Sequence, residues 1–363
     1  MQASSAVEIM PPVTRRTTIT DVARAARVSI QTVSAVFHDK PGISDPTRQR
    51  VRRAIERLHY VPNGLASSLR ARHSRTVGVL IPSITNPYFP DFVRGIEDGA
   101  HRAGYSVFLC NSDHQPEKEI EYLQLLRQHA VSGYVVAYNL NNLDFEKILF
   151  QLATHHTPVI TLGSRQIHER ALVLRTDDCG SAFTLTQYLI ELGHERIGLI
   201  QPPAESLVCR DRTEGFLAAL QKFGLTVRPE YLVPGGFTIE DGQNGATQLA
   251  GRQEPPTAIV AANDLVAIGA ISALKGLGLR VPEQMSIAGF DDIRMAALVD
   301  PPLTTIAQPT YRMGQAAFEA ILEQLESPNS RGRVINFETS LVVRGSTAPP
   351  ALQRSNKSQT LLS

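Results

Sequence analysis

Cysteine is scarce in this chain, which has three cysteines among its 363 residues, at positions 110, 179 and 209. They lie far apart and form no C-x-x-C pair, so the sequence supports neither a disulfide framework nor a zinc site. No apolar run approaches the roughly 18 residues that a membrane helix needs. Residues 1–16 lack the charged start and continuous apolar core of a signal peptide, and we expect them to form a disordered leader. The expected compartment is therefore the cytoplasm.

Sequence motifs of enzyme chemistry are missing as well. No G-x-G-x-x-G follows an expected strand, and the phosphate loop G-x-x-x-x-G-K-[ST], the nucleophile elbow G-x-S-x-G and a metal-spaced histidine pair are absent. The adjacent His155 and His156 would point apart on a helix. We therefore expect no catalytic residue, no cofactor and no metal. Because doubly wound α/β sheets also host many enzymes, an enzyme stays open as an alternative.

Positive charge is unevenly distributed, although the whole chain carries a formal net charge of only +1. Residues 1–76 contain 13 Lys and Arg against 5 Asp and Glu, whereas the remainder contains 23 against 30. A basic module on a mildly acidic body suits a partner with a phosphate backbone, because binding releases condensed counterions. The N-terminal segment is therefore the candidate nucleic-acid-binding part.

The basic segment has the pattern of two short helices separated by a tight turn. Thr18 and Ser29 stand where a hydroxyl caps the first backbone N–H groups of a helix, and Asp21 follows Thr18 at capping-box spacing. The expected inward faces consist of Ile19, Val22 and Ala23 in the first helix and Val33, Val36 and Phe37 in the second. A third amphipathic helix is expected from Ser44 to His59. The pattern favours a helix-turn-helix, whose second helix lies in the DNA major groove, over a generic helical hairpin.

The spacing of several motifs resembles one known family. The chain contains TITDVARAARVSIQTVSAVF at positions 18–37, Tyr-Val-Pro-Asn at 60–63 and Leu-Ala-Ser-Ser-Leu at 65–69. Together these are similar to the headpiece and hinge of the lactose-repressor (LacI/GalR) family of bacterial transcription regulators. The chain departs from the family at Arg27, where relatives commonly have glycine, so we expect strain if the turn is left-handed. At Ala35 the family often has Arg, so readout of one guanine should be weaker.

The resemblance implies a set of DNA contacts. Ile30 and Gln31 would read bases, since glutamine pairs with adenine and isoleucine can touch a thymine methyl. Hydroxyl side chains would contact phosphates, namely those of Thr18, Ser29, Thr32 and Ser34. The hinge contributes Asn63 as a cap, Ala66 as a small residue where two hinge helices approach, and Leu69 as a wedge in the minor groove.

After residue 76 the pattern changes to short apolar runs that alternate with helical stretches, which predicts parallel sheets with crossover helices. The expected strands are 77–81, 106–110, 134–137, 159–162, 196–200, 258–261 and 286–289. The expected helices are 92–103, 117–128, 145–155, 183–192, 213–223, 241–250 and 265–277. Two similar units in succession predict two lobes with a cleft at the carboxyl ends of the strands. The predicted fold class is thus a helical headpiece and hinge helix followed by a two-lobed α/β core.

This second region resembles the periplasmic-binding-protein-like core of the same family. Matching motifs include Asn-Pro-Tyr-Phe at 86–89, Glu-Leu-Gly-His at 191–194, Ala-Asn-Asp at 262–264 and Gly-Phe-Asp-Asp at 289–292. The resemblance implies an effector site formed by Tyr88, Phe89, Arg212, Phe237, Asn263 and Asp291. Arginine suits paired hydroxyls or a carboxylate, and the aromatic rings suit a sugar ring or a purine. The family's usual Asp near Leu162 is replaced by Gly163 and Ser164.

Each effector residue also has a purely structural alternative. Asp291 and Asn263 each follow an expected strand, where such residues often cap the next turn. Arg212 can be an ordinary arginine on a helix surface. Tyr88 and Phe89 can belong to the core.

The sequence therefore predicts five segments and one function. The segments are a leader (1–16), a headpiece (17–61), a hinge (62–75), a core (76–346) and a disordered tail (347–363). The expected function is a transcriptional repressor that binds a pseudo-palindromic operator in double-stranded DNA as a homodimer. Its effector would be a sugar or sugar derivative, with a nucleobase as the alternative. A two-lobed secreted binding protein is disfavoured by the basic headpiece and the missing export signal.

Overall fold

The computed structural model describes residues 17–37, 39–60, 74–137, 142–163, 165–203 and 207–351. The chain divides into two compact units, Met1–Ser74 and Arg75–Ser363. The expected leader, nearly all of the hinge and residues 352–363 lie outside the described ranges. Within those ranges, none of the helices has the length and apolar character needed to cross a membrane.

The first unit contains three helices, α1 (Ile19–Ala26), α2 (Ile30–Phe37) and α3 (Asp45–Arg57). The predicted capping box is confirmed, since the Thr18 hydroxyl accepts the Asp21 N–H and the Asp21 carboxylate accepts the Thr18 N–H. The Ser29 hydroxyl accepts the Thr32 N–H at 3.1 Å and so caps α2 as predicted. These caps satisfy backbone donors that have no partner within the helix.

A small apolar core joins the three helices. Its buried members are Val22, Ala23, Ala26, Val33, Val36, Val51 and Ala54. The predicted inward position of Phe37 is wrong, because this side chain is 48 % exposed at the end of α2. At the last residue of a two-turn helix, the i+4 pattern no longer fixes which face meets the core.

The turn after α1 is left-handed at Arg27, which is the case in which strain is expected. Arg27 has φ 53° and ψ 50°, and the N–H of Val28 closes the turn on the carbonyl oxygen of Ala23 at 3.0 Å. This is the helix-ending geometry in which glycine is preferred. A side chain with a Cβ carries a steric penalty there.

Arg27→Gly is expected to raise the free energy of unfolding of the headpiece by about 1 kcal/mol, because glycine carries no steric penalty in this region. Arg27→Ala is the matched variant, since it removes the same charge but keeps the Cβ, and it should bring no gain. Hydrogen-exchange protection of the α1 and α2 amides measures the difference. Equal protection in the two variants would show that the backbone strain is negligible.

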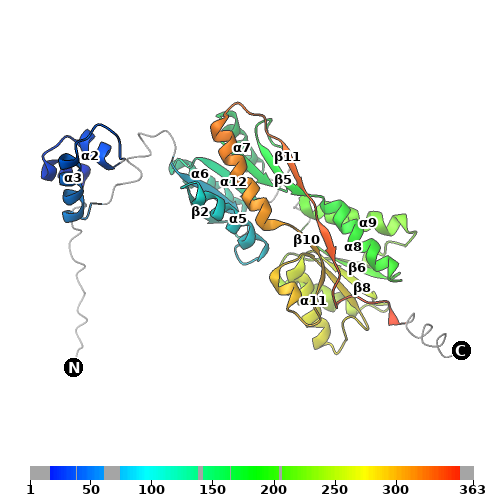
Figure 1. Cartoon of the computed structure of the whole chain (residues 1–363). Coiled ribbons are helices and arrows are strands. Elements are labelled where there is room, and N and C mark those ends of the chain that lie inside the picture. The colour runs from blue at the N-terminus through cyan, green and yellow to red at the C-terminus, as the bar shows by residue number, and fades with distance from the viewer. Residues whose placement is uncertain are drawn as a thin grey trace, which may run out of the picture. The chain divides into compact units, whose positions relative to one another are not determined.

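The second unit contains two mainly parallel sheets, each covered by helices on both faces (Figure 1). The first sheet has the order β11-β5-β4-β3-β1-β2. Its strands are β1 (Thr76–Ile81), β2 (Ser106–Asn111), β3 (Gly133–Ala137), β4 (Val159–Leu162), β5 (Leu172–Thr176) and β11 (Val334–Phe337). Its helices are α5 (Tyr88–Arg102), α6 (Pro116–Gln128), α7 (Leu143–Thr154) and α12 (Thr310–Glu326). Val79 faces α5 and α12, while Leu80 faces α6 and α7, as the twofold period of a strand requires.

The second sheet repeats the plan with the order β12-β10-β9-β8-β6-β7. Its strands are β6 (Ile197–Gln201), β7 (Leu232–Pro234), β8 (Ala258–Ala261), β9 (Ser286–Asp291), β10 (Thr304–Ala307) and β12 (Ser340–Val342), the last antiparallel to β10. Its helices are α8 (Asp178–Glu191), α9 (Leu207–Lys222), α10 (Ile239–Ala250) and α11 (Asp264–Gly276). Two short 3-10 turns, η1 (Pro229–Tyr231) and η2 (Arg294–Ala297), complete the lobe. The predicted strands of both lobes are confirmed to within two residues. The predicted helices are confirmed as well, but α8 begins five residues and α9 six residues earlier than predicted.

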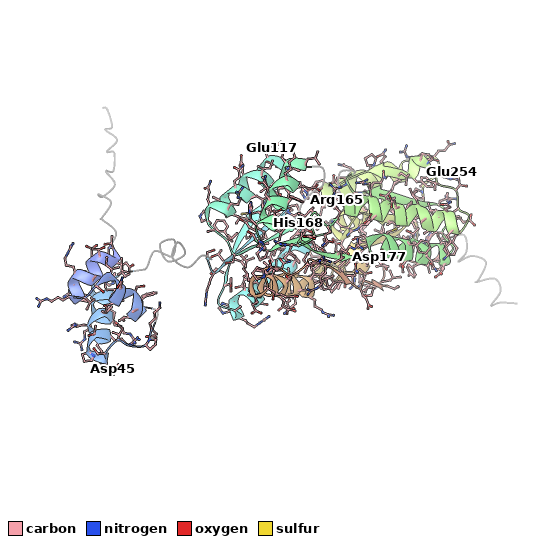
Figure 2. The ribbon with its side chains drawn as sticks, turned by 90° about the horizontal axis from the view of Figure 1, so that it is seen from above. Asp45, Glu117, Arg165, His168, Asp177 and Glu254 are labelled. Carbon is pink, nitrogen blue, oxygen red and sulfur yellow. The ribbon has the colours of Figure 1, made fainter. Side chains whose placement is uncertain are left out.

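The chain crosses between the lobes three times, from β5 to α8, from β10 to α12 and from β11 to β12. Figure 2 shows Asp177 at the first crossover, between the lobe that carries Glu117 and the lobe that carries Glu254. The expectation of two units in simple succession is therefore only partly right. Helix α12 and strand β11 follow the second lobe in sequence but complete the first, where α12 packs against α5.

The core also extends beyond the predicted boundary at residue 346. The Thr347 hydroxyl lies 2.9 Å from that of Thr304, and the carbonyl oxygen of Ala348 lies 2.9 Å from Nε2 of His194. Burial lowers the pKa of His194 to about 4, so this ring is neutral at pH 7 and donates to Ala348. The prediction of a disordered tail is wrong for residues 347 and 348, because a buried polar anchor fixes them.

Candidate functional site

The candidate DNA interface is the exposed side of α1 and α2. Thr18, Ser29 and Gln31 are exposed, whereas Ile30, Thr32, Ser34 and Ala35 are half-buried. Thr18 and Ser29 therefore present hydroxyls at the starts of the two helices, and Gln31 stands free at the second residue of α2. Asn63, Ala66 and Leu69, the predicted hinge contacts, lie outside the described residues.

Arginine side chains on α3 are partly neutralised within the headpiece. Arg48 and Arg52 both donate to the carboxylate of Asp39, which has a left-handed backbone. Asp39 is largely exposed, so these ion pairs contribute little to stability and can exchange for a phosphate. The excess positive charge of the segment thus remains available to a polyanion.

The candidate effector site is a pocket between the two lobes of the core. The pocket opens to solvent and is lined by residues of both lobes. Its walls include all six predicted residues, Tyr88, Phe89, Arg212, Phe237, Asn263 and Asp291. They come from the loops and helix starts that follow strands of both sheets, as the topology predicts.

Arg212 of α9 is the central charged group of the pocket, and it is only 8 % exposed. Its Nε donates to Asp178 at 2.9 Å, one Nη donates to the Ala262 carbonyl at 2.7 Å, and the other lies 3.4 Å from Asp291. The guanidinium also covers the Phe290 ring, 3.7 Å from its centroid. The alternative of an ordinary surface arginine is therefore wrong.

Asp291 ends β9 with φ 112°, a backbone conformation that favours glycine. Its carboxylate accepts the Gln308 amide at 2.7 Å. Burial raises the pKa of Asp291 to about 6, although Arg212 opposes the shift. The fold thus holds a strained, desolvated carboxylate at the pocket wall, as functional sites often do.

The contribution of Asp291 to the stability of the core is expected to fall as pH rises from about 4 to 6, because folded Asp291 keeps its proton up to about pH 6 and the unfolded chain releases it near 3.8. The unfolded state then binds fewer protons, and the loss at pH 7 is on the order of 3 kcal/mol. Urea unfolding of wild type and Asp291→Asn across pH 4–8 isolates this contribution, because other titrating groups cancel. A difference that does not vary with pH would contradict it.

Asn263 has a structural role as well as a place in the pocket. Its side-chain oxygen accepts the Val266 N–H at 2.9 Å and caps α11, while its amide nitrogen lies 3.3 Å from the Phe237 carbonyl. The structural alternative for Asn263, a residue that caps the following helix, is therefore confirmed, although the side chain also lines the pocket. The neighbouring Asp264 is buried and accepts from Thr305 and from the Ile293 N–H, and burial raises its pKa well above the usual value.

Aromatic rings occupy two parts of the pocket wall. Tyr88 and Phe89 meet edge to face with centroids 5.1 Å apart, and Phe89 also packs against the core of the first lobe. Burial raises the pKa of Tyr88, so its phenol is neutral and can donate. His114 and Phe237 stack with centroids 6.0 Å apart and ring planes 18° apart.

Sequence reasoning missed several polar pocket residues, including His114, Arg175, Thr176, Asp178 and Gln308. The Thr176 hydroxyl lies 3.0 Å from the Gln308 oxygen and 3.1 Å from the Asp178 carboxylate. Arg175, Thr176, Asp178 and Gln308 lie at or beside crossovers between the lobes, whereas His114 follows β2. Asp178 offered a local signal, since two consecutive acids follow an apolar run at 172–174.

Comparison with known families gives two matches that together span both units. Residues 18–63 match the family described as "Bacterial regulatory proteins, lacI family". Residues 74–343 match "Periplasmic binding proteins and sugar binding domain of LacI family".

Individual relatives agree with these matches. The transcriptional repressor CytR of Escherichia coli (strain K12) is 35 % identical over 91 % of this chain and 96 % of its own length. The repressor PurR of Haemophilus influenzae (strain PittEE) is 36 % identical over 85 % of this chain and 91 % of its own. The lac repressor dimer bound to operator and the anti-inducer ONPF superimposes with TM-score 0.79, 29 % identity and coverage of 92 % and 100 %. This chain belongs to the LacI family of bacterial regulatory proteins.

Proposed function

We propose that this protein is a transcriptional repressor that binds a pseudo-palindromic operator as a homodimer and responds to a small molecule in the core pocket. The observation that carries the proposal is the combination of a capped, basic helix-turn-helix with a pocket whose walls come from two lobes. Such a protein acts in the cytoplasm, on the nucleoid when it is bound to DNA. The relatives are repressors, one of them solved as a dimer on its operator, and we expect no catalytic turnover.

The proposed DNA contacts divide into base readers and phosphate contacts. Gln31 reads an adenine and Ile30 touches a thymine methyl. The hydroxyls of Thr18, Ser29, Thr32 and Ser34 fix the position of the headpiece on phosphates without reading sequence. Asn63, Ala66 and Leu69 form the hinge that enters the minor groove at the centre of the operator.

The proposed effector is a neutral molecule rich in hydroxyl groups. Arg212 faces two carboxylates, those of Asp178 and Asp291, so its positive charge is already matched within the protein and acceptor oxygens stand beside it. Sugar hydroxyls can donate to these oxygens, whereas an anionic group there would meet like charge. The aromatic faces of Tyr88, Phe89 and Phe237 suit the apolar face of a sugar ring or a flat nucleobase. Solved structures of similar regulators contain cellobiose and ribose as bound ligands.

The proposed control is allosteric. A ligand that contacts both lobes changes their relative placement, and this shifts the balance between folded and unfolded hinge helices. Thr176 and Gln308 join two of the crossovers beside the pocket, so a ligand at Asp291 bears directly on the connection between the lobes. Whether the ligand favours or opposes operator binding depends on which state it prefers.

Selection of binding sites from random duplex DNA tests the proposal. Wild-type protein is expected to enrich a palindromic consensus, and Leu69→Ala is expected to lose the enrichment of the central base step while the half-sites persist. The selected duplex then serves as the probe for screening sugars and nucleobases. Absence of any enriched motif, with and without those compounds, would overturn the proposed function.

A further inference from the structure

Two loops from opposite lobes meet at the edge of the cleft that lies farthest from the crossovers. His114 follows β2 and Phe237 follows β7. These strands are the outer edges of their sheets, whereas the crossovers leave from β5, β11 and β10 at or near the other edges. Because this contact lies farthest from the connections between the lobes, it opposes their separation more effectively than a contact of equal strength near the crossovers would.

The contact itself is a stack of two rings. The imidazole of His114 and the phenyl ring of Phe237 lie nearly parallel, 18° apart, with centroids 6.0 Å from each other. Both residues belong to the wall of the pocket. His114 is exposed and Phe237 half-buried, which places the stack at the mouth of the pocket.

The position of His114 is fixed by its own loop. Asp113 and His114 both have left-handed backbones, with φ 54° and 58°. The His114 N–H donates to the Pro82 carbonyl at 3.2 Å, and the Asp113 carboxylate accepts from Lys118 at 2.6 Å and from the Asn111 amide. Two consecutive residues in this conformation persist only where the surroundings determine them. The imidazole is thus presented toward the opposite lobe by a preformed loop.

We propose that His114 and Phe237 form a clasp that holds the two lobes closed at the mouth of the pocket. An aromatic pair contributes about 0.5–1.5 kcal/mol beyond simple burial. A bias of this size shifts a two-state equilibrium without locking it, so a ligand can still enter and leave. The clasp would set the fraction of closed molecules, and through it the apparent affinity for any effector. The inference goes beyond the proposed function, because it concerns the core alone and needs neither operator nor effector.

Distance measurement between the lobes tests the clasp in the full-length protein. Nitroxide labels on non-natural amino acids would replace Glu117 in α6 and Glu240 in α10, which are exposed and lie on opposite lobes. His114→Asn removes the ring, and asparagine tolerates the left-handed backbone. Phe237→Leu removes the partner ring. Each single variant is expected to raise the ratio of molecules with the open distance to molecules with the closed distance by about twofold to tenfold. The double variant should raise this ratio no further than a single variant does.

His129→Asn is the matched control, since His129 packs on Phe108 in the same lobe, with centroids 5.1 Å apart, away from the pocket wall. It should leave the distance distribution unchanged. Unchanged distances in both His114→Asn and Phe237→Leu would overturn the clasp. An equal effect of His129→Asn, or additive effects in the double variant, would overturn it as well, because either result means general loosening instead of one contact.

Discussion

Replacing Arg212 with methionine is expected to lower the free energy of unfolding of the core by about 3–5 kcal/mol at pH 8, the usual cost of leaving buried charges without their partner. The carboxylates of Asp178 and Asp291 would then face each other without a cation, and the Ala262 carbonyl would lose a donor at 2.7 Å. The loss should shrink at pH 5, because Asp291, with a pKa of about 6, is then largely protonated. Urea unfolding at the two pH values measures both effects.

Arg333→Met is the matched control. Arg333 donates to both oxygens of Glu323 at 2.7 Å, but the two side chains are about half exposed. Solvent screening limits such a surface pair to about 1 kcal/mol or less. A loss in Arg212→Met no larger than in this control would show that Arg212 is not the central charge of a desolvated cluster.

Gln31→Ala is expected to weaken operator binding by about 2–6 kcal/mol, since a bidentate contact to adenine contributes roughly 1–3 kcal/mol and a dimer makes it twice. Gln31 is exposed at the start of α2, so its loss leaves the packing of the headpiece intact. Binding to unrelated DNA and the salt dependence of binding should not change, because no phosphate contact is lost. Fluorescence anisotropy with the selected duplex and with a scrambled duplex measures both.

Gln49→Ala provides the comparison, because Gln49 is an exposed glutamine on α3 of the same headpiece. It should bind the selected duplex like wild type. If Gln31→Ala weakened binding to both duplexes equally, Gln31 would be a positioning residue without a role in reading sequence. If Gln31→Ala bound like wild type, the base contact would be absent.

The headpiece was predictable because its signals are local. The caps at Thr18 and Ser29 and the apolar spacing of Val22, Val33 and Val36 act within a few residues, and each lies in the structure where the sequence places it. The longer helices and the buried strands of the core were predictable for the same reason. The exposed Phe37 shows the limit, because the last residue of a short helix takes its direction from the neighbouring turn.

The missed elements depend on distant parts of the chain. Strands β11 and β12 are short sheet edges with half-exposed residues, so they show no continuous apolar run. Strands β5, β7 and β10 were missed as well, although β5 contains an apolar run at 172–174. Helix α12 buries its apolar face on α5, more than two hundred residues earlier. No local pattern identifies the lobe to which such an element returns.

The same distinction between local and long-range signals applies to the pocket residues. The six predicted effector residues all line it, because family motifs mark them. His114 and Gln308 were missed because they become pocket residues only when edge loops and crossovers from different parts of the chain meet. Arg212 shows that even a marked residue needs the structure, since its burial between two carboxylates is invisible in the sequence RDRTEGF.

The return of α12 and β11 to the first lobe has a consequence for synthesis on the ribosome. Phe92 and Ile96 of α5 remain uncovered by their final partner until residues 310–326 have been made, and β5 lacks its second neighbour, β11, until Phe337. By then the second lobe up to β10 has already been synthesised. The first lobe therefore stays incomplete while most of the second lobe is being made, and throughout that interval its apolar helix face is open to chaperones or to wrong partners.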